Sequence, residues 1–382
     1  MRRRHHRGYR IRQVTHKTEA SDGARAPAFL RSSQEAGERC GGNYRSHWSM
    51  FTWLRIIKGL DKMELNDKIT DMHLCLASPG KSLLFPGPTS ITAEYDDLVK
   101  EITAYTDKIK KDDFMVTYGP YFFRGRRDRQ AVDGDWLRLR RMASTPPIIT
   151  ELPTPMPTGV KKLVMSPHLL TGGLVYVIGA PASGKTTSCS AAVVSRLTEF
   201  GGYAYTVEDP PEMPLNGWHG KGYCSQTWVP GDSLADWQSA FRGVLRSQPS
   251  ATPCILFVGE VRDAESAAAL VRAASSGFLV FATGFGTDIP SSLDTLVRLA
   301  SEGMELKSTL DSLSNVLRLV IHQRIVNGHL TARVLASANG RTAVAAKLRE
   351  GRLTHLEGDI QYQDNQVMSG ADIFMEHLKQ AA

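Results

Sequence analysis

The sequence predicts an α/β fold in two parts: a parallel sheet with helices on its faces, preceded by a smaller α/β domain. The larger part is predicted from four apolar runs that alternate with helical or irregular stretches. The runs are LVYVIGA at 174–180, GYAYTVED at 202–209, CILFVGE at 254–260 and FLVFATG at 278–284. Such alternation is typical of a parallel sheet with helical crossovers. From residue 308 on, the pattern indicates a helix that runs into a hairpin and then a mainly helical tail.

The first run leads into a glycine-rich loop, LVYVIGAPASGKTT, which is followed by a helical pattern at 188–200. A loop that wraps a phosphate must expose backbone N–H groups without a Cβ in the way, and must open a helix whose N-terminus favours anions. The match to G-x-x-x-x-G-K-[ST] predicts Lys185 on the β- and γ-phosphates and Thr186 on Mg²⁺. The alternative is an ordinary glycine-rich turn. The predicted binding residues are Gly179, Ala182, Ser183, Gly184, Lys185, Thr186 and Thr187.

Two of the apolar runs end in carboxylates. CILFVGE ends at Glu260, about seventy residues after the loop, as a buried parallel strand that delivers an acid to a nucleotide would. GYAYTVED leads into Glu208, Asp209 and Glu212, and Mg²⁺ and a water beside a triphosphate need such acids. The alternatives are a solvated glutamate at a strand end and an acidic turn shaped by its two prolines.

The smaller domain is predicted from a mixed pattern. DKITDMHLCLAS at 67–78 alternates like a strand, and residues 90–111 are helical with Ser90 as the N-cap. VTYGPYFFRGRR at 116–127 and DWLRLRRM at 135–142 are each predicted as one strand that alternates apolar residues with arginine. The apolar stripe of the helix consists of Ile91, Tyr95, Leu98 and Ile102.

Composition sets the expected domain boundaries. Residues 1–49 hold eleven basic and four acidic residues, which accounts for the whole net charge of +7, and their scattered apolar residues predict a disordered basic arm. Five prolines between residues 146 and 157 predict a stiff linker, because each fixes φ and extends its predecessor. The predicted parts are the arm at 1–49, the small domain at 50–144, the Pro-rich linker at 145–158 and the phosphate-binding domain with a helical C-terminal region at 159–382.

Composition also excludes several classes of protein. Five cysteines without a C-x-x-C spacing argue against a zinc module or a disulfide framework and favour the cytoplasm. No apolar run reaches the roughly 20 residues that a membrane helix requires. Contact with nucleic acid is expected only through the basic arm. The alternative interpretation of the arm is upstream sequence translated ahead of a start at Met50 or Met63.

Four segments resemble the type II/type IV secretion ATPase family in order and spacing: GLVYVIGAPASGKTT, YTVEDPPE, ILFVGEVRDAESAAALVRAASSGFLVFATG and RLVIHQRIVNG. DMHL at 71–74 is similar to a D-x-H-L of the family's N-terminal domain, and LREGR near Leu348 looks like its C-terminal domain. The resemblance implies a PAS-like domain followed by a RecA-like ATPase domain that binds ATP and Mg²⁺. It implies a homo-oligomer, a hexamer in this family, peripheral at the inner membrane beside platform or channel proteins. The compact layout is similar to the retraction-motor-like branch, which includes ATPases of IncI-type conjugation and Dot/Icm-type secretion.

The resemblance also implies roles for single residues. Glu260 would polarise the attacking water, and Glu208 and Glu212 would form an acid box, with Glu208 and Glu260 near Mg²⁺.

Arginines of the N-terminal domain would reach the γ-phosphate, by position Arg124 and Arg140 with Arg138 as a substitute. Arg138 and Arg140 share a face because side chains alternate along a strand. We expect the mutual repulsion of these cations to be offset by the γ-phosphate bound at Lys185. The alternative is that they are solvated arginines on an exposed strand.

Two segments depart from the family pattern. The family's G-H-L-V-F-A-T-L-H-T reads GFLVFATGFG at 277–286, so Phe278 and Phe285 stand where histidines are expected. A phenyl ring cannot hydrogen-bond a phosphate, and we expect weaker turnover or weaker coupling between subunits. The family's A-I-R-N-L-I-R-E reads AVAAKLRE, with Ala345 and Ala346 in place of Arg and Asn, which favours secretion or conjugation over pilus retraction.

The sequence therefore predicts an ATP-hydrolysing motor of a type IV secretion, conjugative transfer or type IV pilus system, which rotates one domain against the other around the nucleotide. Three alternatives stay open. They are a pilus retraction ATPase, a nucleotide-binding assembly subunit that does not hydrolyse ATP, and a nucleic-acid-binding factor that uses the basic arm.

Overall fold

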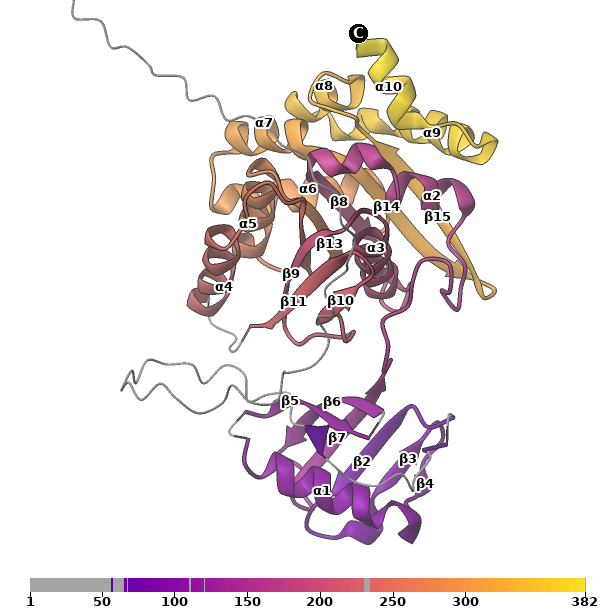
Figure 1. Cartoon of the computed structure of the whole chain (residues 1–382), viewed down its shortest axis with the longest axis vertical. Helices are drawn as coiled ribbons and strands as arrows, with labels where there is room; N and C mark the ends of the chain where they lie inside the picture. The colour runs from indigo at the N-terminus through magenta and orange to yellow at the C-terminus, as the bar shows by residue number, and fades with distance from the viewer. Residues whose placement is uncertain are drawn as a thin grey trace, which may run out of the picture. The chain divides into compact units, whose positions relative to one another are not determined.

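The computed structural model describes residues 56–57, 65–66, 68–109, 111–119, 121–229 and 234–381. They form a seven-stranded sheet and an eight-stranded sheet, which Figure 1 colours by position in the chain. We call the seven-stranded sheet with its helix the N-terminal lobe, and the eight-stranded sheet with its helices the C-terminal lobe. The predicted basic arm, residues 1–49, lies outside the described residues.

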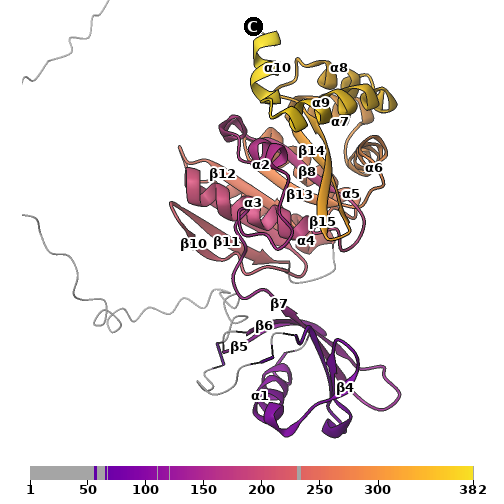
Figure 2. The same cartoon turned by 90° about the vertical axis from the view of Figure 1, so that its right-hand side faces the viewer.

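The N-terminal lobe is a mainly antiparallel sheet with a helix on one face (Figure 2). Its strand order is β1-β5-β6-β7-β2-β3-β4. Helix α1 (Asp96–Thr106) buries Leu98 and Ile102 in the core of the lobe, so the predicted small α/β domain is confirmed. The strands are β1 (Ile56–Ile57), β2 (Asp71–Cys75), β3 (Leu83–Phe85), β4 (Thr89–Ser90), β5 (Asp113–Tyr118), β6 (Tyr121–Asp128) and β7 (Trp136–Met142).

Two local predictions for this lobe are wrong. Ser90 is not an N-cap: it lies in β4 and pairs with Leu83, and α1 begins at Asp96 after a 3₁₀ turn at 93–95. Residues 116–127 are not one strand but the end of β5 and most of β6, which pair as a hairpin. Gly119, with φ 54°, lies between these strands, and such a left-handed backbone suits glycine best.

The C-terminal lobe is built on a sheet with the order β10-β11-β9-β12-β13-β8-β14-β15. The six central strands are parallel, and the edge strands β10 and β15 are antiparallel to their neighbours. This confirms the predicted parallel sheet. The strands are β8 (Gly173–Ile178), β9 (Gly202–Glu208), β10 (Gly217–His219), β11 (Gly222–Trp228), β12 (Cys254–Val258), β13 (Leu279–Gly284), β14 (Leu317–Val326) and β15 (His329–Ala336).

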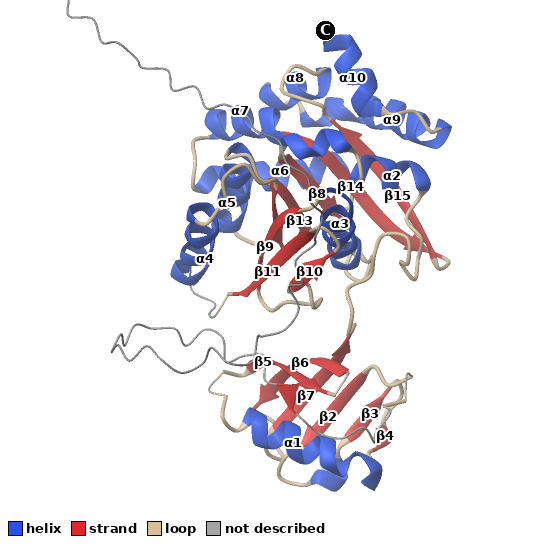
Figure 3. Cartoon of the chain, in the orientation of Figure 1, coloured by secondary structure: helices blue, strands red, loops and turns tan. Residues whose placement is uncertain are grey.

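Helices cover both faces of this sheet (Figure 3). In β8, Leu174, Tyr176 and Ile178 belong to one hydrophobic cluster, and Val175 and Val177 belong to the other. Residues of α4 to α7 contribute to the first cluster, and residues of α2, α3 and α10 to the second. The helices are α2 (Thr158–Val164), α3 (Lys185–Phe200), α4 (Leu234–Arg246), α5 (Ala264–Ser275), α6 (Ile289–Glu302), α7 (Leu306–Val316), α8 (Ala343–Arg349), α9 (Glu357–Ser369) and α10 (Ile373–Ala381).

Two segments carry more structure than the sequence predicts. The sequence predicts no strand in the stretch that follows the apolar run at 202–209, but this stretch contains β10 and β11, and β11 extends the parallel sheet beside β9. In the Pro-rich linker, Ile149, Leu152 and Met156 are buried in the cluster that contains α3. The segment thus packs as part of the C-terminal lobe, and the domain boundaries stay a prediction. Across the described ranges, no helix has the length and apolar character needed to cross a membrane.

Candidate nucleotide-binding site

The glycine-rich loop joins β8 to α3 and lies against the neighbouring strand β14. A Cβ at Gly179 would overlap the carbonyl oxygen of Gln323 and lie 2.9 Å from the Ser183 hydroxyl oxygen. Gly179 and Gly184 have φ values of 152° and 81°, a region that favours glycine. The loop therefore needs glycine because of the protein's own packing, before any phosphate is considered.

Gln323 of β14 holds the loop from the side. The Gln323 side chain is fully buried, and its Nε2 donates to the Ser183 carbonyl at 2.5 Å. The pairing of β8 with β14 sets this contact, since His322 lies opposite Ile178, the last residue of β8. The resemblance included this glutamine in RLVIHQRIVNG but gave it no role. A polar residue inside a buried strand was the only sequence feature that could have indicated this role, and its meaning depends on the pairing of β14 with β8.

Lys185 begins α3 and folds back over the loop. Its side chain is nearly buried, with 7% of the residue exposed, and its Nζ donates to the carbonyl oxygens of Gly179 at 3.1 Å and Ala180 at 2.8 Å. Burial lowers the pKa of Lys185, and the Glu260 carboxylate acts in the opposite direction. The ring of Phe285 lies over the ammonium, 4.8 Å from Nζ to the ring centroid. The structure thus brings Lys185, Glu260 and Phe285 together.

Glu260 lies two residues beyond the end of β12. Its side chain is 17% exposed and forms an ion pair with Arg262. The next strand fixes the backbone on both sides of Glu260, because the Thr283 hydroxyl donates to the Gly259 carbonyl and the Val261 N–H donates to the Thr283 carbonyl at 2.9 Å.

Glu208 ends β9 and lies beside this turn. In the sheet Val207 is opposite Val258, so the next residues along the two strands, Glu208 and Gly259, lie side by side. A Cβ added at Gly259 would lie 3.3 Å from Glu208 Cγ. The structure therefore places Glu208 and Glu260 at the same edge of the sheet. It assigns neither a role, and their roles stay predictions.

Glu208 is a buried carboxyl with 1% of the residue exposed. Burial raises the pKa of Glu208 to about 7, although hydrogen bonds from Gln226, Thr206 and the backbone of Glu212 act against the rise. Gln226 Nε2 donates to Glu208 at 2.9 Å and to the Met213 carbonyl at 2.7 Å. Gln226 thereby ties the acidic turn to β11, a strand that the sequence analysis missed.

The predicted metal residues do not form a cage made by protein alone. Among the described residues, no group of three or more His, Cys, Asp or Glu side chains could hold a metal ion. Mg²⁺ at phosphate sites usually takes one or two protein oxygens plus phosphate and water oxygens. Thr186, the second residue of α3, and the two carboxylates carry oxygen atoms of that kind, and their role as Mg²⁺ ligands stays a prediction.

The predicted arginines lie on β6 and β7 of the N-terminal lobe. Arg124 pairs directly opposite Arg140 in the sheet. Arg140 donates to Asp71 at 2.9 Å, and Arg138 donates to Asp128 at 2.8 Å. Carboxylates of the same lobe therefore already offset the charges of Arg138 and Arg140, where a phosphate was expected to do so, and the contact of Arg124 and Arg140 with the γ-phosphate stays a prediction. Exposed ion pairs of this kind contribute little stability, so they leave the arginines available to a stronger anion.

The two phenylalanines that replace the family histidines lie at opposite ends of β13. Phe278 is fully buried in the core, and its carbonyl accepts the N–H of Gly173 at the start of β8. Phe285 is 50% exposed at the loop end of the strand. Of the two phenylalanines, only Phe285 is thus placed to cause directly the weaker turnover or weaker coupling that the sequence predicts.

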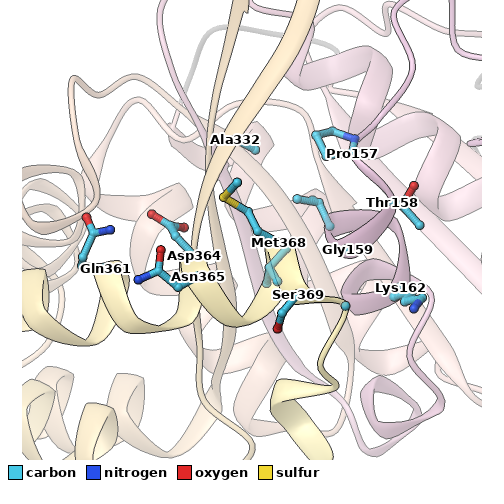
Figure 4. Close-up of a pocket in the computed structure, with 13 residues that line it drawn as sticks. Pro157, Thr158, Gly159, Lys162, Ala332, Gln361, Asp364, Asn365, Met368 and Ser369 are labelled. Carbon is cyan, nitrogen blue, oxygen red and sulfur yellow. The ribbon is translucent and has the colours of Figure 1, made fainter.

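A cavity of about 540 Å³ lies elsewhere in the C-terminal lobe (Figure 4). It is lined by residues of α2 and α9, including Thr158, Lys162, Asp364 and Met368, and by Ala332 of β15. None of the predicted site residues lines it, so it is separate from the glycine-rich loop.

A parallel sheet, a glycine-rich loop that opens α3 with a lysine, and acids at the ends of β9 and β12 define a P-loop protein with a RecA-like fold. Residues 158–371 match the family described as Type II/IV secretion system protein. Because this match covers more than half of the chain, the chain belongs to that family.

Curated relatives include the type IV pilus retraction ATPase PilT of Pseudomonas aeruginosa, 29% identical over 211 residues, which are 54% of this chain and 58% of PilT. The type II secretion system protein HxcR of the same species is 34% identical over 174 residues, 46% of this chain and 32% of HxcR. The chain thus spans between about a third and three fifths of the length of these relatives.

Solved structures share the fold. A crystal structure of the pilus retraction motor PilT with bound ADP has a TM-score of 0.60 at 23% identity and covers 77% of this chain and 86% of that one. The ATPase DotB of Legionella pneumophila has a TM-score of 0.58 at 21% identity, with 82% and 87% covered.

The raised pKa of Glu208 predicts that stability falls as the pH rises. The unfolded chain loses this proton near pH 4.5 and the folded protein near pH 7, so between these values the folded protein binds more protons and its free energy of unfolding decreases. Above pH 7 the loss is on the order of 3 kcal/mol. We expect Glu208→Gln to raise the free energy of unfolding by that order at pH 8, and hardly at all at pH 4, in urea denaturation with a chelator present.

Glu302→Gln is the matched control, because Glu302 is exposed at the end of α6 and its replacement should change neither value. A Glu208→Gln effect of equal size at both pH values would contradict the assigned cause.

Proposed function

We propose that this chain hydrolyses ATP as the motor of a type IV secretion, conjugative transfer or type IV pilus system. The observation that carries the proposal is the position of Lys185 over the glycine-rich loop, close enough to Glu260 for that carboxylate to oppose the lowering of the lysine pKa. A lysine that binds phosphate oxygens and an acid that orients water are the two groups that triphosphate hydrolysis requires from the protein.

One feature of the loop supports the binding of the phosphates of ATP. The loop opens the 16-residue helix α3, whose N-terminus favours anions. Thr186, Glu208 and Glu260 would hold Mg²⁺, which would neutralise charge on the phosphate oxygens. Lys185 is already held over the loop by its bonds to two loop carbonyls.

In this proposal each group of the chain has one role in the reaction. Lys185 offsets the charge that develops on the phosphate oxygens. Glu260 orients a water and accepts its proton as the water attacks the γ-phosphorus and the bond to the bridging oxygen breaks, which gives ADP and inorganic phosphate. Arg262 pairs with the same carboxylate but is 69% exposed, so the release of Glu260 costs little. Arg124 and Arg140 would add positive charge at the γ-phosphate.

Family membership supports the larger assembly that we propose. It is a ring of identical subunits, six as in the family pattern, in the cytoplasm and peripheral at the inner membrane, in contact with platform or channel proteins. The C-terminal segment favours secretion or conjugation, since Ala345 is fully buried in α8 and Ala346 is exposed there, and neither offers the polar side chain of the retraction signature.

Two alternatives to the secretion or conjugation motor are each supported by one observation. The likeness to PilT favours a pilus retraction ATPase. The ring of Phe285 over Lys185 favours a subunit that binds nucleotide for assembly without hydrolysing it. A role for the basic arm in binding nucleic acid stays a prediction, because the arm lies outside the described residues.

Two substitutions test hydrolysis directly. Removal of one preorganised charge at a phosphoryl-transfer site costs about 10²–10³ in rate. We expect Lys185→Ala to lose nucleotide binding or turnover, and Glu260→Gln to bind ATP but to lose turnover by that factor, in a steady-state phosphate-release assay. Glu302→Gln should match the wild type. Wild-type turnover no higher than that of Glu260→Gln would favour the assembly subunit.

The arginines of the N-terminal lobe have their own test. We expect Arg124→Ala and Arg140→Ala to lower turnover sharply while nucleotide affinity stays within about tenfold, because the contact is strongest in the transition state. Arg126→Ala is the control, since Arg126 lies on β6 and pairs with Asp113 of the neighbouring strand at 2.7 Å, and it should keep full turnover. If both single variants turn over like the wild type, the arginines are only solvated strand residues.

A further inference from the structure

Phe285 is the one aromatic side chain that the described residues place over the loop lysine. Its ring centroid lies 4.8 Å from Lys185 Nζ, within the range of a cation–π contact. Lys185 itself is 7% exposed, whereas Phe285 is 50% exposed. The ring is therefore the more exposed partner of this contact.

The backbone around Phe285 is packed on both sides. A Cβ at Gly284 would overlap the Tyr176 hydroxyl, and a Cβ at Gly286 would overlap the Ser292 hydroxyl. His322 of β14 is hydrogen-bonded to the backbone of Gly286. The two glycines thus let the chain pass tightly between β8, β14 and α6, and this packing fixes the position from which Phe285 projects.

The ring competes for the ammonium with any phosphate. An ammonium has three N–H donors, and Lys185 gives two of them to the carbonyls of Gly179 and Ala180. The third donor and the charge remain for a phosphate oxygen, and the Phe285 ring lies over this ammonium. A phosphate oxygen that takes this third donor therefore competes with the ring for the charge of the ammonium.

We propose that Phe285 is an affinity-setting residue of the nucleotide site: its ring stabilises Lys185 in an arrangement that the phosphates must displace, and so weakens their binding. This inference rests on the proposed nucleotide site, and it explains what the phenyl group does in place of a side chain that could hydrogen-bond phosphate. A cation–π contact at a partly exposed position changes an equilibrium by about two- to fivefold. Removal of the ring should therefore tighten binding by that factor.

The test measures dissociation constants of the full-length protein for ATP, ADP and tripolyphosphate. Phe285→Leu, which keeps an apolar side chain without the ring, should bind all three about two- to fivefold more tightly. Phe285→Tyr keeps the ring and should restore the wild-type values. Tyr362→Leu removes an aromatic side chain that is 59% exposed on α9 and should leave all three values unchanged. Thermal unfolding of each variant verifies that it is folded.

Tripolyphosphate separates two ways in which the ring could act. If the ring acts on Lys185, the gain appears with tripolyphosphate as well as with the nucleotides. A change confined to ATP and ADP would mean that the ring contacts the base or sugar, and it would overturn the proposal. Weaker binding by Phe285→Leu would overturn it as well, because the ring would then support the bound phosphates.

Lys185→Ala distinguishes failure of this inference from failure of the proposed function. If Lys185→Ala loses binding and Phe285→Leu binds like the wild type, the nucleotide site stands and the role of Phe285 is refuted. If Lys185→Ala binds ATP and tripolyphosphate as tightly as the wild type, Lys185 does not hold the phosphates and the inference about the Phe285 ring is refuted, whereas the proposed hydrolysis is refuted only if Lys185→Ala also keeps wild-type turnover.

Discussion

The parallel pairing of β8 with β14 is the constraint on which the rest of the site depends. It brings the Gln323 carbonyl so close to Gly179 that no side chain fits between them, and it lets Gln323 Nε2 bond to the Ser183 carbonyl at 2.5 Å. The same strand reaches the end of β13 through His322 and the backbone of Gly286. One strand therefore fixes both the loop that holds Lys185 and the turn that carries Phe285.

Buried charge at this edge is retained at a cost to stability. Lys185 and Glu208 are both nearly buried, and burial disfavours the charged form of each, lowering the pKa of the lysine and raising the pKa of the carboxyl. Apolar side chains there would give a more stable fold. The proposed binding of a charged triphosphate and its metal would account for such groups, since the ligand would compensate for the desolvation.

Features that depend on a local sequence pattern could be predicted from the sequence. Features that depend on pairing between distant segments could not. The loop, Lys185 and the acid-ended strands follow from spacing alone. Gln226 did not, because it acts from β11, a largely polar strand that becomes part of the sheet only through its pairing with β9. Asp71 and Asp128 neutralise Arg140 and Arg138 across strands whose register no pattern revealed.

We propose that Lys185 and Glu260 together make this chain an ATPase rather than a nucleotide-binding scaffold. The most direct measurement incubates the purified full-length protein with Mg²⁺ and limiting radiolabelled ATP, and then separates the bound and released nucleotides. We expect ATP to be converted into ADP and inorganic phosphate, at a rate that rises with the protein concentration until the limiting ATP is fully bound. Recovery of the bound nucleotide as intact ATP at all protein concentrations would contradict it.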